Sequence, residues 1–158
     1  MRLMGVSMRS WLSVAALLAG FASPVSAAQD DIRYACNLSA DEESAEVYSD
    51  GTGRAEFALE RTTLKLSWKI SFEKLSGPAT SVGVYGPDRP GGNAGLLIDL
   101  GKPNSPVVGS KTLNDGELQY FVTGRVYMNI LTNKYKDGEL RCQITRLRDT
   151  PPAAAKTQ

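Results

Sequence analysis

The residue types in this chain restrict the chemistry that it can perform. Its 158 residues include no histidine, and its only cysteines are Cys36 and Cys142. Without an imidazole, the chain cannot assemble a Ser-His-Asp or Cys-His catalytic group, or a histidine-ligated copper or zinc site. If the two cysteines pair, no thiolate nucleophile remains. The sequence therefore predicts a protein that is not an enzyme and that holds no metal or cofactor.

Carboxylates are the remaining groups that could perform acid–base chemistry. Asp88 lies in a glycine- and proline-rich segment, Gly86–Gly95, and Glu139 follows the Asp137-Gly138 turn. A pair of carboxylates is the usual machinery of a glycan hydrolase. A hydrolase that uses Asp88 and Glu139 on envelope glycans or peptides is therefore one alternative function.

Two further motifs are interpreted as loops. Asp41, Glu42, Glu43 and Glu46 cluster without the spacing of an EF-hand, so a solvated acidic surface is favoured over a weak calcium site. Gly91–Gly95 leads into apolar residues rather than into a helix with Lys and Ser or Thr, which a phosphate-binding loop requires. We expect a turn there.

The amino-terminal segment predicts export. Arg2 and Arg9 precede an apolar stretch at 11–22, and Val25-Ser26-Ala27 fits a small-residue cleavage site. A membrane anchor is the alternative, but the stretch is shorter than the roughly 20 apolar residues that span a bilayer. We expect residues 1–27 to be a signal peptide and the location to be periplasmic or secreted, with no stable membrane span after its removal. In an exported chain, the cysteine pair favours a disulfide over two buried thiols.

The net charge gives little electrostatic guidance to a partner. The whole chain has 18 basic and 17 acidic residues, a formal net charge of +1. Loss of Arg2 and Arg9 with the signal peptide would leave the charge slightly negative. A charge so close to zero gives no reason to expect a nucleic acid or an anionic membrane as partner, and we expect a monomer.

Alternating apolar and polar residues dominate the rest of the chain. Leu64, Leu66, Trp68, Ile70 and Phe72 give the cleanest run. Alternation of this kind is typical of strands with one buried and one solvated face. We expect a single all-β domain at 28–149, an antiparallel β-sandwich or barrel with seven to eight strands, and at most one short helix at Asn114–Thr123. Residues 150–158 are expected to be a disordered tail.

The segment Gly124–Ile144 (GRVYMNILTNKYKDGELRCQI) identifies a family. It resembles the terminal motif of chordin-type (CHRD) domains, usually Tyr-Val-Asn-Ile/Val-His-Thr followed by Pro-x-Gly-Glu-Ile-Arg-Gly-Gln. The resemblance extends over roughly residues 35–145. It implies an immunoglobulin-like, Greek-key β-sandwich of the kind found in animal growth-factor antagonists and in short secreted bacterial proteins.

Three positions depart from the family pattern. The family usually carries His-Ile-His where this chain has Gly83-Val84-Tyr85, and a further histidine where it has Leu131. Alternation places Gly83, Tyr85 and Leu131 away from the core, where family histidines could gather on one face. Whatever those histidines do elsewhere, this chain cannot do it with imidazole.

The resemblance and the missing catalytic groups together predict a binding module for a protein or an envelope component. A purely structural role in the envelope is a further alternative. Tyr127, Asn129 and Leu131 are expected to form an outward row, and Glu139 and Arg141 to form an exposed ion pair or docking element. The complete candidate binding face is Tyr85, Asp88, Arg89, Tyr127, Asn129, Leu131, Glu139 and Arg141.

Overall fold

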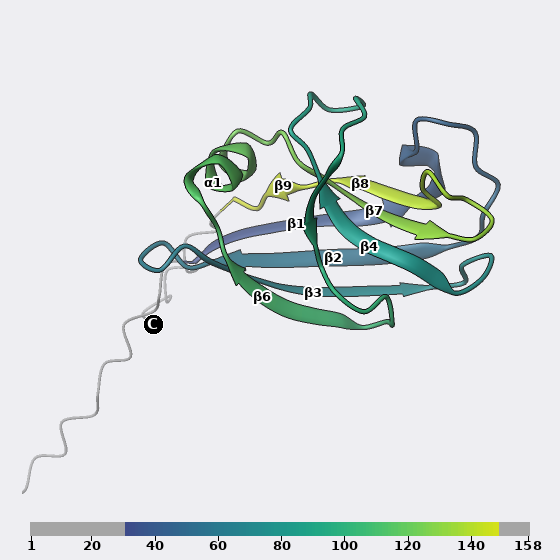
Figure 1. Cartoon of the computed structure of the whole chain (residues 1–158), viewed down its shortest axis with the longest axis horizontal. Coiled ribbons are helices and arrows are strands. Elements are labelled where there is room, and N and C mark those ends of the chain that lie inside the picture. The colour runs from purple at the N-terminus through teal and green to yellow at the C-terminus, as the bar shows by residue number, and fades with distance from the viewer. Residues whose placement is uncertain (1–30, 149–158) are drawn as a thin grey trace, which may run out of the picture.

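The computed structural model describes residues 31–148, so the predicted signal peptide and the predicted tail lie outside the described residues (Figure 1). Nine strands, one α-helix and one 3-10 turn make up the described part. In chain order they are β1 Ile32–Ser39, η1 Ala40–Glu42, β2 Thr52–Leu59, β3 Lys65–Glu73, β4 Ala79–Tyr85, β5 Leu96–Asp99, β6 Val107–Thr112, α1 Asp115–Val122, β7 Tyr127–Thr132, β8 Leu140–Gln143 and β9 Thr145–Arg146.

The strands form one continuous antiparallel sheet. Its order is β5-β4-β7-β8-β1-β2-β3-β6, and β9 pairs with β1. The sheet curls so that β4 and β7 lie across β1, β2 and β3 (Figure 1). The predicted all-β antiparallel fold with one short helix is confirmed. The described residues hold nine strands rather than seven or eight because Thr145 and Arg146 form the two-residue strand β9.

The core fills the space inside the curl. In β3, Leu66, Trp68 and Ile70 are buried while Lys65 and Lys69 are exposed, as the alternation predicts. Burying a large apolar side chain contributes roughly 1.5–3 kcal/mol, so these inward rows supply most of the driving force for folding.

Helix α1 closes one end of this core. Asn114 caps it, with a reciprocal capping box to Glu117, as expected for a helix that starts at this residue. The ring of Phe121 then packs edge-on against Tyr34 and Phe57, with centroids 5.7 and 6.0 Å away. The chain leaves the helix through Gly124, whose φ of +68° suits glycine.

The predicted disulfide between Cys36 and Cys142 is present. It joins β1 to β8, whose direct pairing is limited to Ser39 and Arg141. The bridge therefore reinforces the weakest seam of the sheet. It closes a loop of 106 residues. A cross-link of this span contributes about 4.7 kcal/mol in the chain-entropy model.

Candidate functional site

The outer faces of β4, β7 and β8 carry most of the predicted site residues. Register places Tyr85 beside Tyr127 and Asn129 beside Arg141. The two tyrosine rings stack with centroids 5.6 Å apart. The guanidinium of Arg141 lies over the Tyr127 ring, 3.6 Å from its centroid.

This group holds down the loop between β4 and β5, residues 86–95. Arg141 donates to the Asn93 side-chain oxygen at 2.8 Å and to the Gly92 carbonyl at 2.5 Å. The Tyr127 hydroxyl accepts from the Ala94 amide at 2.9 Å and donates to the Ala94 carbonyl at 3.0 Å. The guanidinium of Arg141 and the phenol of Tyr127 thus hold the backbone of this loop against the sheet.

The prediction that Tyr127, Asn129, Glu139 and Arg141 are solvent-exposed is wrong, because all four are buried. Tyr127 and Arg141 do lie on the non-core side of the sheet, but the 86–95 loop covers them. The remaining predicted residues stay accessible: Arg89 is exposed, and Tyr85, Asp88 and Leu131 are partly exposed.

Glu139 is fully buried and does not pair with Arg141, so the predicted ion pair is wrong as well. Its two oxygens accept four hydrogen bonds, each 2.6 Å long, from the Ser49 hydroxyl, the Ser76 amide and hydroxyl, and the Thr132 hydroxyl. Burial alone would raise the pKa of Glu139, but these donors lower it below its ordinary value. This carboxylate joins the β1–β2 connection, the β3–β4 connection and the end of β7.

The two carboxylates of the alternative hydrolase are anchored at separate points beside β7. The Asp88 amide bonds to the Arg125 carbonyl before β7, whereas the Glu139 amide bonds to Ile130 within it. Those two anchor residues are roughly 16 Å apart at the usual rise per strand residue. Paired glycosidase carboxylates are no more than roughly 9.5 Å apart. Among residues 31–148, no group of three or more His, Cys, Asp or Glu side chains is placed to hold a metal ion.

The three positions that carry histidine elsewhere in the family lie on one face. Gly83 pairs with Asn129, Tyr85 with Tyr127, and Leu131 with Ser81. In this chain Leu96 covers Gly83, since a Cβ at that glycine would lie only 2.4 Å from a Leu96 methyl. Tyr85, Leu96 and Leu131 are apolar side chains of this face that keep exposed surface, and they are here named the apolar strip.

Leu96 is the member that sequence reasoning missed. It is 51% exposed, whereas Ile98, two residues later in the same strand, is buried. Alternation would put both on the core face. A bulge between Val84 and Tyr85 shifts the register, so that Ile98 pairs with inward Val84 and Leu96 with outward Tyr85. The glycines before Leu96 were the sole local hint of irregular pairing.

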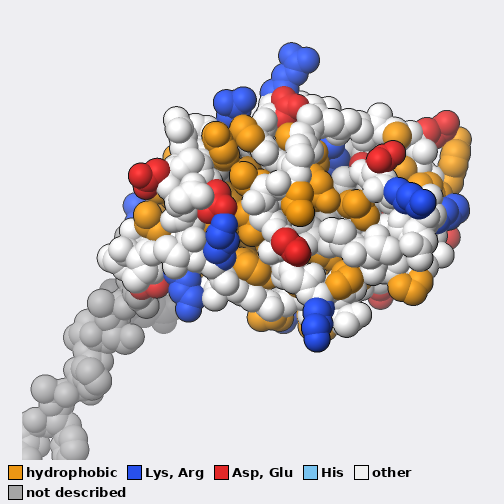
Figure 2. Space-filling view, viewed as in Figure 1, with side chains coloured by type: hydrophobic (Ala, Val, Ile, Leu, Met, Phe, Trp, Pro, Cys, Tyr) orange, Lys and Arg blue, Asp and Glu red, His pale blue; other side chains and the backbone are white. Residues whose placement is uncertain are grey.

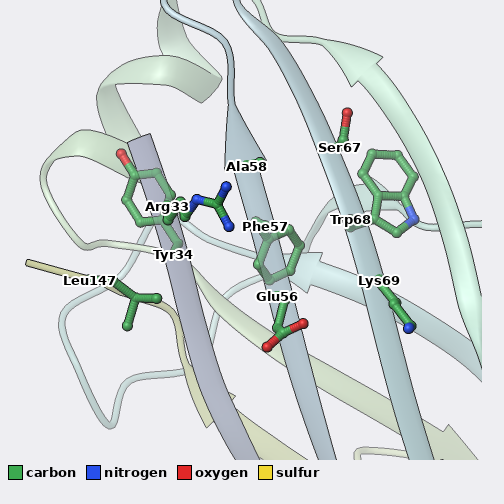
Figure 3. Close-up of a pocket in the computed structure, with 9 residues that line it drawn as sticks. All are labelled: Arg33, Tyr34, Glu56, Phe57, Ala58, Ser67, Trp68, Lys69 and Leu147. Carbon is green, nitrogen blue, oxygen red and sulfur yellow. The ribbon is translucent and has the colours of Figure 1, made fainter. Parts of the chain in front are cut away.

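A hollow of about 300 Å³ lies on the other half of the sheet, over β1, β2 and β3 (Figure 3). Tyr34, Phe57 and Trp68 come from three adjacent strands, with charged side chains of both signs beside them. None of the predicted site residues lines this hollow. It therefore adds no support to the sequence-based site.

No helix in residues 31–148 is both long and apolar enough to cross a membrane. Residues 34–144 match the family model of the CHRD domain. No curated protein and no solved structure matches the chain significantly. Because the family match covers more than half of the sequence, the chain belongs to the CHRD domain family.

Proposed function

We propose that this chain is an exported, non-catalytic binding module that docks onto a protein or envelope component through the apolar strip and the adjoining loop. The disulfide supports export, because such bridges persist in oxidising compartments outside the cytoplasm. Membership of the CHRD family is consistent with a binding role.

The proposal rests on which side chains of this face form hydrogen bonds within the protein and which remain accessible. The polar atoms of Arg141, Tyr127 and Glu139 form hydrogen bonds within the protein, so they are not free to act on a substrate. What remains accessible is apolar Tyr85, Leu96 and Leu131, with Asp88 and Arg89 on the loop beside them. An apolar centre with a polar rim is the usual anatomy of a protein interface.

The fixed loop also favours binding. Ordering a flexible segment on association costs roughly 0.5–1.5 kcal/mol per immobilised side chain. Here the backbone at Gly92, Asn93 and Ala94 is already held by Arg141 and Tyr127, which reduces that cost. Figure 2 shows basic and acidic side chains interspersed on the viewed face, so we expect contact shape rather than net charge to select the partner.

The test is a crosslinking pull-down of the exported protein with Tyr85→Asp and Leu131→Asp combined. Charges in the strip should reduce capture of a specific partner by at least about tenfold, because each desolvated charge opposes burial of the interface. Val108→Asp is the matched control, since Val108 is 69% exposed but lies in β6, at the opposite edge of the sheet.

Three results would count against the proposal. Capture that survives the double substitution excludes the strip as the docking face, provided that the variant keeps its thermal unfolding transition. Equal loss with Val108→Asp would indicate general surface damage. Absence of any captured partner, together with an envelope defect on deletion, would favour the purely structural role instead.

A further inference from the structure

Two buried oxygens without hydrogen-bond donors lie beside Gly138. One is Oε1 of Glu43, directly after the η1 turn, and the other is Oδ1 of Asn129 in β7. A Cβ built on Gly138 would lie 2.3 Å from the Glu43 oxygen, 2.5 Å from the Asn129 amide nitrogen and 2.6 Å from the Asn129 oxygen. The two oxygens are therefore at most about 4.9 Å apart, with no side chain of residue 138 to separate them.

Both buried oxygens stay unsatisfied unless something supplies a hydrogen. Asn129 is only 4% exposed, and its amide nitrogen donates to the Asp137 carbonyl at 3.2 Å. Rotating the amide by 180° would offer the nitrogen to Glu43, but it would then set Oδ1 against the Asp137 carbonyl. Either orientation leaves at least one buried acceptor without a donor. An unsatisfied buried acceptor costs about 1–3 kcal/mol, so the missing hydrogen matters.

We propose that Glu43 carries this hydrogen itself, as a carboxylic acid whose O–H donates to Asn129 Oδ1 and latches the η1 turn onto the β7–β8 hairpin. Deprotonation transfers the proton to water and leaves an anion against the amide oxygen. The latch then opens. The inference concerns the connection between the turn and the hairpin, and it does not depend on the proposed binding role.

The groups around Glu43 determine where it titrates. Burial raises the pKa of Glu43 to about 7, opposed by Arg141 in β8 and by the Ser44 backbone amide, and reinforced by Asp137. Tyr85 faces it from β4. On its own segment the neighbouring charges are Asp41 and Glu42, both exposed. Arg141 is not the direct partner, because its hydrogen bonds go to Gly92 and Asn93 and its guanidinium stacks on Tyr127.

Opening the latch should loosen more than the η1 turn. The Ser44 hydroxyl, next to Glu43, accepts a hydrogen bond of 2.8 Å from the Asn93 side chain in the 86–95 loop. Asn93 is also a partner of Arg141. The turn and the loop are thus coupled through adjacent residues. Both should be held tightly below neutral pH and more loosely above it.

The experiment follows the Glu43 carboxyl carbon by NMR from pH 4 to 9 in the full chain, together with amide hydrogen exchange of residues 40–48. We expect a Glu43 midpoint near 7. The opening equilibrium of the segment, corrected for intrinsic exchange, should rise by about tenfold between pH 6 and pH 8. Glu43→Gln stays neutral and can donate from its amide, so it should remove this rise and retain protection at both pH values.

Glu42→Gln is the matched control, because it removes an exposed carboxylate one residue away. It should leave the rise in exchange unchanged. A Glu43 midpoint near 4.5 would overturn the proposal and point to an ionised carboxylate bridged by water. A rise that persists in Glu43→Gln would overturn it too. The titration is measured on the unsubstituted chain, so it decides the question even if the variant folds poorly.

Discussion

Two carboxylates near Gly138, the fully buried Glu139 and the partly exposed Glu43, differ in the hydrogen-bond donors that surround them. Glu139 lies deeper than Glu43, with no exposed surface. Its oxygens nevertheless accept four hydrogen bonds, whereas Oε1 of Glu43 accepts none within the described residues. The deeper group has a lowered pKa, and the shallower one has a pKa raised to about 7.

The comparison teaches that the donors supplied, rather than depth alone, decide the charge of a buried acid. Three hydroxyls and one amide replace the water around Glu139, so its anion is favoured without any cation. Glu43 is beside a cation, yet Arg141 is committed to other partners and its field only partly offsets the burial. One carboxylate is a fixed structural link, and the other can change its state near neutral pH.

The largest effect is expected when the well-solvated acid is removed. Glu139→Ala should lower the free energy of unfolding by about 3–4 kcal/mol, because it leaves the Ser49, Ser76 and Thr132 donors unpaired and opens a cavity. Urea denaturation followed by tryptophan fluorescence measures this change. Glu42→Ala, at an exposed carboxylate, should cost less than about 0.5 kcal/mol. Equal effects of the two substitutions would show that the hydrogen bonds of Glu139 do not contribute to the free energy of unfolding.

Local sequence pattern predicted much of the fold, because strands and helix caps depend on residues that are close together in sequence. The alternation in β3 predicted its inward row, and the short helix was expected at Asn114–Thr123, where α1 is found. The disulfide was predicted from the count of two cysteines together with the expected export of the chain. Each of these inferences needs residues that are near in sequence or simply counted.

The site was less predictable because it depends on what covers a sheet face. Alternation assigned Tyr127 and Arg141 to the non-core side, but it carries no information about the 86–95 loop that folds over them. It likewise could not bring Glu43 to Asn129, since that approach depends on the path of a connection between strands. The exposure of Leu96 depends on a bulge, which shifts alternation by one position.

A smaller effect is expected when Arg141 is replaced. Arg141→Met keeps the length of the side chain but removes the hydrogen bonds to Gly92 and Asn93 and the contact with Tyr127. We expect a loss of about 2 kcal/mol in the free energy of unfolding and faster hydrogen exchange in residues 86–95. The pKa of Glu43 should rise further, because Arg141 lowers it. Arg89→Met, at an exposed arginine of the same loop, is the control. It should change neither the free energy of unfolding, nor the hydrogen exchange of residues 86–95, nor the pKa of Glu43.

The smallest effect, and the most direct test of the comparison, is the pH dependence of stability. The folded pKa of Glu43 is above its ordinary value, so its stabilising contribution is complete below about pH 4.5 and is lost as pH rises through about 7. The full shift would correspond to roughly 3 kcal/mol, but Glu43 is partly exposed and solvent screens its charge. We therefore expect a decrease of about 1 kcal/mol between pH 5 and pH 8.

Glu139 should produce the opposite slope. Its folded pKa is below the ordinary value, so its contribution is complete above about pH 4.5 and is lost as the solution becomes more acidic. Stability measured by urea denaturation at intervals from pH 3 to 9 should rise and then fall. Glu43→Gln should flatten only the limb above pH 5 and leave the acid limb intact. If both limbs survive that substitution, the neutral-pH transition belongs to another group, and Glu43 is ionised in the folded protein just as Glu139 is.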